Sequence, residues 1–266
     1  VKINCKVLAK LVIYSACALR KLLGERKHCR LYGSEERMEV ENDSVLFDLT
    51  RRSPLRRAGY DFLVTQSPDI RGIDVALLYQ PKLFRLLAHC SVRVPSAQNG
   101  FRPTRDILHA TGLLPSGDTL HVVAVHLPSR SGNSRQSARH RRLAMSSLCT
   151  VLDSLQGKKT VLMGDFNAEP SDQLFQMLED RMISLMPQSK SELRKAKGTY
   201  VFQGQWGFLD HIFVSPALKP QADPQAKVGA FPFLVDKDGH PFRTFRGPYY
   251  AGGISDHLPV FVEMSF

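Results

Sequence analysis

Short apolar runs alternate with segments of helical periodicity along most of the chain. Two long connections that carry proline and glycine, around 186–206 and 216–253, are predicted to be surface loops at the strand ends. The alternation of strands and helices predicts a mixed α/β fold. The pattern predicts helices over 44–51, 135–156 and 172–180, and strands near 61–65, 73–79, 105–112, 119–126, 160–164, 208–214 and 258–264.

Composition is typical of one globular domain. The chain has 266 residues, 43% of them hydrophobic, which is enough for a substantial buried core. Its five cysteines are odd in number and lack C-x-x-C spacing, which indicates free thiols rather than a disulfide framework or a zinc site. The formal net charge is +11, but residues 1–38 hold nine Lys or Arg against three Glu and so contribute +6 of it. The moderately basic remainder suits phosphate esters in general, nucleic acids included.

Two polar clusters beside apolar runs carry the candidate chemistry. Asp165 and Asn167 follow the run 160–163 and stand two residues apart, so both side chains can face one cleft. Asp256 and His257 precede the last predicted strand, and they combine a carboxylate that can bind a cation with an imidazole that can exchange a proton near neutral pH. Taken alone, each cluster is more typical of a solvated turn.

Four further residues extend this set. Asp210 lies within the apolar run 208–214, where an unpaired carboxylate would be costly to bury and therefore needs a partner. His126 ends the predicted strand 119–126, and Arg105 begins the strand 105–112. Glu39 lies in a charged segment. For Arg105 and Glu39, an ordinary surface position is the alternative interpretation, and for His126 the alternative is a capped loop residue.

In this order, the motifs resemble those of the endonuclease/exonuclease/phosphatase superfamily, which includes pancreatic deoxyribonuclease, the exonuclease III group, neutral sphingomyelinases and inositol polyphosphate 5-phosphatases. The resemblance covers about residues 39–266. It implies a four-layer α/β sandwich, in which two packed β-sheets are flanked by helices. It also implies Glu39 and Asp256 as ligands of Mg²⁺, which Mn²⁺ can replace because it accepts the same oxygen ligands.

The same resemblance implies a role for each of the other candidates. His257, oriented by Asp210, would activate or position the attacking water. Asp165 and Asn167 would hold the nucleophile and the phosphate, and His126 would stabilise developing charge or protonate the leaving oxygen. Substrate phosphate would be contacted by Arg105 and Asn167.

These residues predict a metal-dependent phosphodiesterase, foremost an endonuclease or exonuclease, with nucleic acid among the candidate substrates and a monomeric state expected. An inositol-phosphate enzyme is disfavoured because Leu162-Met163 and Ala168-Glu169 stand where that group carries Trp and Arg. A sphingomyelinase-like enzyme would need an exposed apolar loop, for which 229–235 is the candidate, although a core strand is the safer interpretation of that segment. A catalytically weakened binding protein is the third alternative.

Residues 1–38 depart from the family pattern. Relatives open with an apolar strand that ends in Asn, whereas this chain offers only Asn4 with almost no strand before it. Relatives also have an apolar strand that runs directly into the metal-binding Glu, whereas residues 34–38 before Glu39 have no strand pattern. Residues 7–23 could form an amphipathic helix, but charged residues interrupt it too often for a membrane span, and no signal-peptide pattern is present. We therefore predict a soluble protein with an atypical, truncated or altered segment over 1–38 and a catalytic domain over 39–266, in a compartment that the sequence leaves open.

Overall fold

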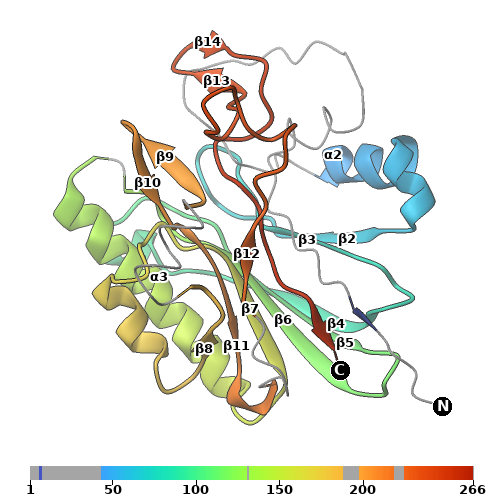
Figure 1. The fold of residues 1–266 in the computed structure, drawn as a ribbon. Helices are drawn as coiled ribbons and strands as arrows, with labels where there is room; N and C mark the ends of the chain where they lie inside the picture. The colour runs from blue at the N-terminus through green and yellow to red at the C-terminus, as the bar shows by residue number, and fades with distance from the viewer. Residues whose placement is uncertain (1–5, 8–42, 131, 188–197, 219–224, 266) are drawn as a thin grey trace.

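A computed structural model of the chain describes residues 6–7, 43–130, 132–187, 198–218 and 225–265 (Figure 1). The predicted metal ligand Glu39 and the alternative Asn4 lie outside these residues. Within the described part of the chain, no helix is long and apolar enough to cross a membrane.

A six-stranded mixed sheet forms the centre of the molecule. Its strands β6 and β7 run parallel, and every other neighbouring pair is antiparallel. In spatial order the strands are β4 (Arg85–Val92), β5 (Ile107–Leu113), β6 (Thr119–His126), β7 (Thr160–Asp165), β11 (Asp210–Val214) and β8 (Ile183–Ser184).

Helix α3 (Ser134–Ser154) covers one face of this sheet. It begins after Asn133, whose side chain accepts a hydrogen bond from the backbone N–H of Gln136 at 3.1 Å and so caps the first turn. A 3₁₀ helix (Gln173–Leu178) packs beside it, where an α-helix over 172–180 was predicted. The apolar side chains between these helices and the sheet include Val123, Val125, Met145, Leu148, Leu152, Leu162, Phe166 and Phe213.

The other face of the sheet packs against a layer of short strand pairs. These pairs are β2 (Asp61–Val64) with β3 (Ala76–Tyr79), β12 (Lys227–Val228) with β15 (Val260–Phe261), and β1 (Lys6–Val7) with β16 (Met264–Ser265). A second core fills the space between the layers, with Leu63, Leu77, Leu108, Val122, Met163, Ile212 and Val260 among its members.

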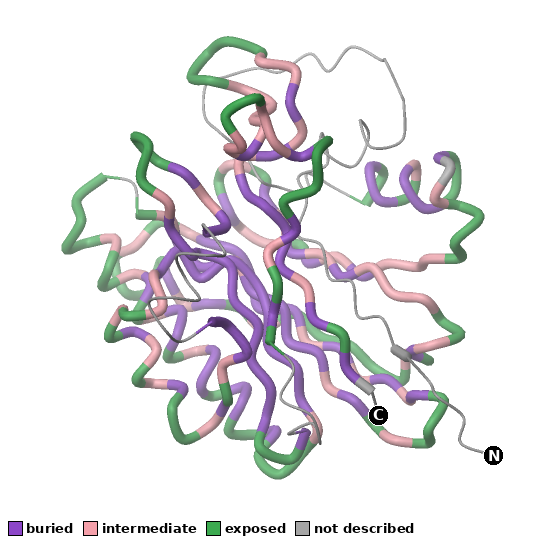
Figure 2. The backbone as a smooth tube through the Cα atoms, in the orientation of Figure 1, coloured by how far each residue is buried: buried purple, intermediate pink, exposed green. Residues whose placement is uncertain are grey.

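Helix α2 (Asp43–Phe47) and the π-helical turn that continues it (Asp48–Arg52) form the outermost layer. Their buried residues Leu46 and Leu49 pack with Phe62, Val64, Ala76 and Leu78 of β2 and β3. Helix, large sheet, paired strands and helix therefore follow one another, and buried residues are concentrated along the central strands (Figure 2). The predicted four-layer α/β sandwich is confirmed.

The structure differs from the sequence predictions in the bounds of one strand and in several strands that were not predicted. The last predicted strand, 258–264, is interrupted and appears as β15 and β16, while the exposed edge strand β4 was not predicted. The two predicted loops also contain strand pairs, β9 (Tyr200–Phe202) with β10 (Gln205–Gly207), and β13 (Phe245–Arg246) with β14 (Tyr249–Tyr250). These strands are two or three residues long, too short for a period-2 pattern to be visible in sequence.

Candidate active site

Three adjacent strands bring candidate residues together by their pairing. His126, the last residue of β6, lies opposite Asp165, the last residue of β7. Asp165 in turn lies opposite Asp210, the first residue of β11. Because paired residues on neighbouring strands point to the same face of a sheet, the three side chains converge, and His126 Nε2 lies 3.5 Å from Asp165 Oδ2.

The end of β7 and the turn that follows it are held by a close backbone approach and by hydrogen bonds. A side chain at Gly164 would collide with the backbone carbonyl of Val125 on the neighbouring strand, so glycine is required there. Asn167 has a φ of +50°, a left-handed conformation that asparagine tolerates. Its backbone N–H donates to Asp165 Oδ1 at 2.7 Å, and its Nδ2 donates to Asp165 Oδ2 at 3.2 Å and to the Leu127 carbonyl at 3.1 Å. The Asp165 and Asn167 side chains are thus fixed relative to each other.

Asp210 has the partner that its buried position requires. His257 Nδ1 lies 2.7 Å from Asp210 Oδ2, and both side chains are almost fully buried. The backbone N–H of His257 donates to Ser255 Oγ at 3.1 Å, and that of Leu258 donates to the Thr199 carbonyl at 2.7 Å, which fixes this segment beside β11.

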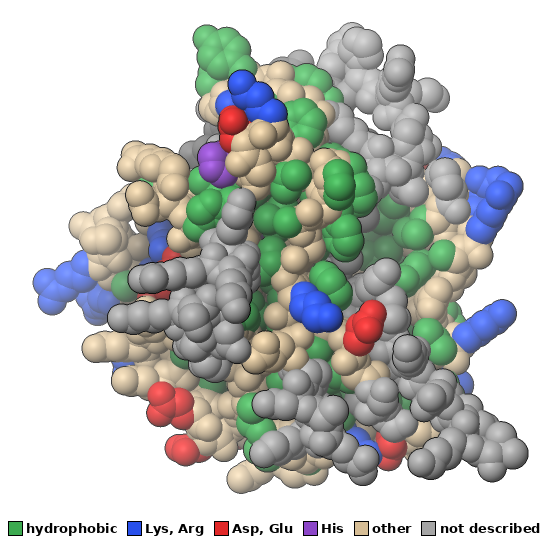
Figure 3. Space-filling view, viewed as in Figure 1, with side chains coloured by type: hydrophobic (Ala, Val, Ile, Leu, Met, Phe, Trp, Pro, Cys, Tyr) green, Lys and Arg blue, Asp and Glu red, His purple; other side chains and the backbone are tan. Residues whose placement is uncertain are grey.

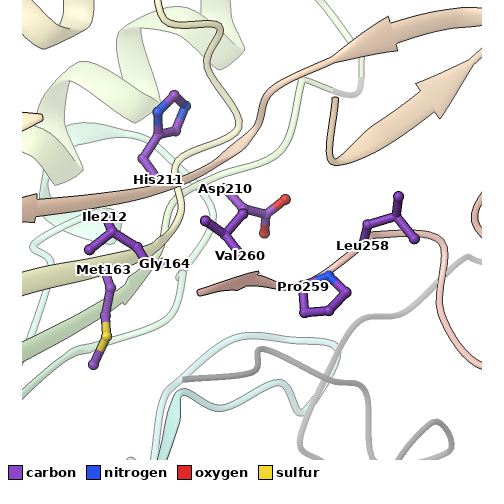
Figure 4. Close-up of a pocket in the computed structure, with 8 residues that line it drawn as sticks. All are labelled: Met163, Gly164, Asp210, His211, Ile212, Leu258, Pro259 and Val260. Carbon is purple, nitrogen blue, oxygen red and sulfur yellow. The ribbon is translucent and has the colours of Figure 1, made fainter. Parts of the chain in front are cut away.

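Asp210 and its neighbour His211 also line a small pocket. In Figure 4 the carboxylate of Asp210 lies toward Leu258 and Pro259, whereas His211 points away from that segment. The imidazole of His211 is instead buried, with Nε2 at 2.9 Å from the Ala168 carbonyl. The side chains of these two adjacent residues of β11 therefore point in different directions, as alternating residues of a strand do.

Burial and charge separate the protonation states of the site residues. Burial alone would lower the pKa of His257, but the charge and hydrogen bond of Asp210 outweigh it and raise that pKa to about 9. Burial, and then the charge of Asp210, raise the pKa of Asp165 to about 7. Burial, and then the charge of Arg105, hold the pKa of His126 well below its usual value. At neutral pH the site therefore holds a charged His257, a neutral His126 and an Asp165 close to its midpoint.

Arg105 lies beneath the site. Its side chain is 2% exposed, and it donates from Nη1 to Asp69 Oδ2 at 3.1 Å. Nε and Nη2 donate to the backbone carbonyls of His126 and Leu127 at 3.1 and 2.6 Å. These bonds hold the end of β6 and the start of the following loop. The predicted contact of Arg105 with substrate stays a prediction.

Asp256 lies nearer the surface than the other carboxylates of the site. Its side chain is 15% exposed, and Oδ2 lies 3.9 Å from Nη1 of Arg243. Within the described residues, Asp165, Asp210 and His257 form a group whose potential ligand atoms lie within 4.8 Å of one another. His257 Nδ1 is bonded to Asp210, and the other potential donors of the group are the carboxylate oxygens of Asp165 and Asp210. Such a donor set fits Mg²⁺ or Mn²⁺.

Three residues that the sequence did not mark as functional contact the site. Arg130 donates from Nε to the backbone carbonyl of Asn167 at 2.8 Å. The Tyr200 ring centre lies 4.7 Å from that of His257, and Arg243 approaches Asp256. Arg130 begins the stretch 130–142, which is rich in Arg and Ser and is typical of a solvated loop and helix start, and the other two come from the long connections. No local pattern therefore distinguishes them from surface residues.

The candidate site thus combines a buried carboxylate–imidazole pair with a second carboxylate that is fixed by an asparagine, on a four-layer α/β sandwich. The chain belongs to the endonuclease/exonuclease/phosphatase family, whose model matches residues 18–265. Members of this family are hydrolases that act on phosphate esters. No curated protein sequence matches the chain significantly.

Solved structures support the same fold. The human Nocturnin catalytic domain with bound sulfate is 19% identical, with 80% of this chain and 74% of that chain covered and a TM-score of 0.52. A mannosyl-6-phosphatase from Bacteroides thetaiotaomicron is 18% identical over 84% and 82% of the two chains, with a TM-score of 0.52. ANGEL2, a 2′,3′-cyclic phosphatase, is 15% identical over 85% and 79%, with a TM-score of 0.54. At these identities the likeness shows the fold.

Proposed function

We propose that the protein is a divalent-cation-dependent phosphodiesterase, foremost an endonuclease or exonuclease. The observation that carries the proposal is the buried 2.7 Å contact between Asp210 and His257, with Asp165 opposite Asp210 on the neighbouring strand. Burying a carboxylate is costly unless it is paired, and here the pairing keeps a charged imidazole inside the site. The charged imidazole of His257 can donate a proton, and the carboxylate of Asp165, with a pKa near neutrality, can accept one.

The protonation states suggest how the residues divide the work. Asp165, with a pKa of about 7, is the proposed base that accepts the proton of the attacking water, and Asn167 keeps its carboxylate in place. The Nδ1 of His257 is bonded to Asp210, so its Nε2 is the proposed donor to a phosphate oxygen. Neutral His126, beside Asp165 at 3.5 Å, is the proposed residue that stabilises charge developing on the leaving oxygen.

Glu39 and Asp256 are the proposed ligands of Mg²⁺, with Mn²⁺ as a substitute. A phosphodiester resists attack because its own negative charge repels the nucleophile, and a bound cation supplies charge that neutralises the non-bridging oxygens. Asn167 is a proposed contact of the phosphate. Arg105, predicted from the sequence as a second contact, is proposed to act through its hold on the backbone of His126 and Leu127.

A sphingomyelinase-like hydrolase is the second candidate, because of one observation. Phe231 and Phe233, in the segment 229–235, are 42% and 51% exposed. Their rings stack with centres 5.8 Å apart. The interpretation of this segment as a core strand is therefore wrong for these two side chains, and an exposed aromatic pair suits contact with a lipid surface.

The test is hydrolysis by the purified full chain with Mg²⁺ on single- and double-stranded DNA, RNA, bis(4-nitrophenyl) phosphate and sphingomyelin vesicles. We expect turnover of the phosphodiesters, and we expect exhaustive chelation with EDTA to abolish it and added Mg²⁺ or Mn²⁺ to restore it. The His257→Ala variant, purified in the same way, controls for contaminating enzymes. Undiminished turnover after chelation would refute the metal-dependent mechanism. A preference for sphingomyelin would favour the second candidate.

A further inference from the structure

Arg243 lies at the edge of the candidate site and is held there by contacts of three different kinds. Its guanidinium carbon lies 5.1 Å from the centre of the Tyr200 ring, in a cation–π arrangement. Nη2 donates to the backbone carbonyl of Val201, and Nη1 lies 3.9 Å from Asp256 Oδ2. The side chain is 16% exposed, so the charge is partly shielded from solvent but can still be reached.

The contacts of Arg243 lead directly to the residues proposed for catalysis. Tyr200, under the guanidinium, also packs its ring against the imidazole of His257 with the two ring centres 4.7 Å apart. The backbones of Tyr200 and His257 form an isolated antiparallel bridge. Asp256 precedes His257 in the chain. Arg243 is therefore one residue removed from His257 by two separate routes, through Tyr200 and through Asp256.

The backbone around Arg243 is held in one position by residues 251–253. Gly253 approaches the backbone so closely that any side chain there would collide with the carbonyl oxygens of Phe242 and Arg243. The N–H of Gly253 donates to the carbonyl of Arg243 at 2.9 Å, and that of Ala251 donates to the carbonyl of Thr244 at 2.8 Å. Strands β13 and β14 then extend away from this closed base. The backbone of Arg243 is therefore held by hydrogen bonds and by close packing against Gly253.

From this placement we propose that Arg243 is a substrate-binding residue that contacts the phosphate of the ester, with Tyr200 as its positioning residue. A planar guanidinium matches phosphate oxygens in geometry and charge, and a charged hydrogen bond in a partly buried site is stronger than one in water. The Tyr200 ring and the Val201 carbonyl restrict the guanidinium before substrate binds, which lowers the entropic cost of the contact. The proposal rests on the proposed function, because it assigns a phosphate ester to this site.

A neighbouring arginine provides a matched control. Arg246 lies three residues further on, in β13, and pairs with Asp236 at 3.0 Å with 64% of its side chain exposed. Figure 3 shows Lys or Arg side chains beside Asp or Glu side chains at the top of this face, in the region of β13 and β14. Replacing Arg246 removes the same charge from the same segment without touching Tyr200 or Asp256. Any general effect of net charge on an anionic substrate should therefore appear in both variants.

The experiment measures two quantities for wild type, Arg243→Lys, Arg243→Met, Tyr200→Phe, Tyr200→Ala and Arg246→Ala. The first is KM and kcat for bis(4-nitrophenyl) phosphate with Mg²⁺, and the second is the affinity for inorganic phosphate by calorimetry.

We expect Arg243→Met to raise KM and weaken phosphate binding by about tenfold or more. Arg243→Lys should recover part of this, since it keeps the charge but loses the planar geometry. Tyr200→Ala removes the ring and should weaken phosphate binding, and Tyr200→Phe, which keeps the ring, should recover most of that loss. Arg246→Ala should stay within about twofold of wild type.

Thermal unfolding of each variant separates a binding defect from a loss of fold, and Arg243→Met keeps most of the apolar stem to limit that loss. Unchanged phosphate affinity and KM in a folded Arg243→Met protein would overturn the proposal while leaving the phosphodiesterase assignment intact. Equal losses in Arg243→Met and Arg246→Ala would also overturn it, because the effect would then be one of general charge. If wild type binds phosphate through Arg243 but hydrolyses no phosphodiester, the proposed catalytic function fails and the binding role stands.

Discussion

Separating the Asp210–His257 pair should reveal whether the two residues act as one unit. The variants are His257→Ala, Asp210→Ala and the double change, with Asp210→Asn as a version that keeps the shape of the side chain and removes its charge. We expect each single variant to lower kcat on a phosphodiester by about a hundredfold or more, the range over which a positioned proton-transfer group contributes. The double variant should cost little more than the worse single, because either change alone disables the pair.

The structure also sets the size and the pH dependence of the effect on stability. The shift in the pKa of His257 from 6.5 to about 9 corresponds to about 3 kcal/mol of stabilisation of the charged ring in the folded state. Because the folded pKa lies above the unfolded one, this contribution is complete below about pH 6.5 and disappears as the pH rises through 9. Urea unfolding at pH 6 and pH 9.5 should therefore show a larger gap between wild type and His257→Ala at the lower pH.

The alternative makes His257 a loop residue and Asp210 a structural acceptor. His257→Ala would then leave turnover nearly intact, and Asp210→Ala would mainly lower the melting temperature. Single losses in kcat that multiply in the double variant would likewise refute the reasoning, since they would show that the residues act independently.

Two further predictions concern the neighbours of this pair. If Asp165 must lose its proton and His257 must keep its own, kcat/KM should rise as the pH passes about 7 and fall as it passes about 9, and a flat profile between pH 5.5 and 10 would contradict these roles. Replacing Gly164 by Ala should destabilise the fold by at least about 2 kcal/mol and lower the activity, because the added carbon meets the backbone of Val125; a melting temperature equal to that of wild type would show that β6 and β7 can separate without cost.

Sequence patterns were sufficient for the parts of the fold that are buried and regular. Strand β6 lies at its predicted bounds, and α3 departs from its prediction by one or two residues, because both have continuous apolar faces in the core. The edge strand β4 was missed for the opposite reason. Most of its residues are exposed, so the burial that creates an alternating pattern is absent. The stretch 172–180 has helical spacing but folds as a 3₁₀ helix, and spacing over two turns does not distinguish the two.

Some features of the candidate site could be predicted from the sequence and others could not. The need of Asp210 for a partner follows from its apolar neighbours, and the structure supplies that partner in His257, as proposed from the sequence. The contacts of Tyr200 with Arg243 and with His257 join residues more than 40 positions apart in the chain, for which a single sequence holds no signal. The predicted boundary after residue 38, the metal role of Glu39 and the catalytic roles of the other residues stay predictions.

His126, Asp165 and Asp210 lie opposite one another on β6, β7 and β11, so the proposed chemistry depends on the register of these three strands. A slip of one residue in β7 would turn Asp165 to the opposite face of the sheet and leave His126 and Asp210 facing Gly164 or Phe166 instead. A slipped sheet could still bury apolar side chains on both faces, since all six residues of β7 are buried. Spectroscopic measures of secondary structure would hardly change, whereas the proposed hydrolytic centre would be lost. Activity is therefore a more sensitive reporter of correct folding in this protein than its overall content of helix and strand.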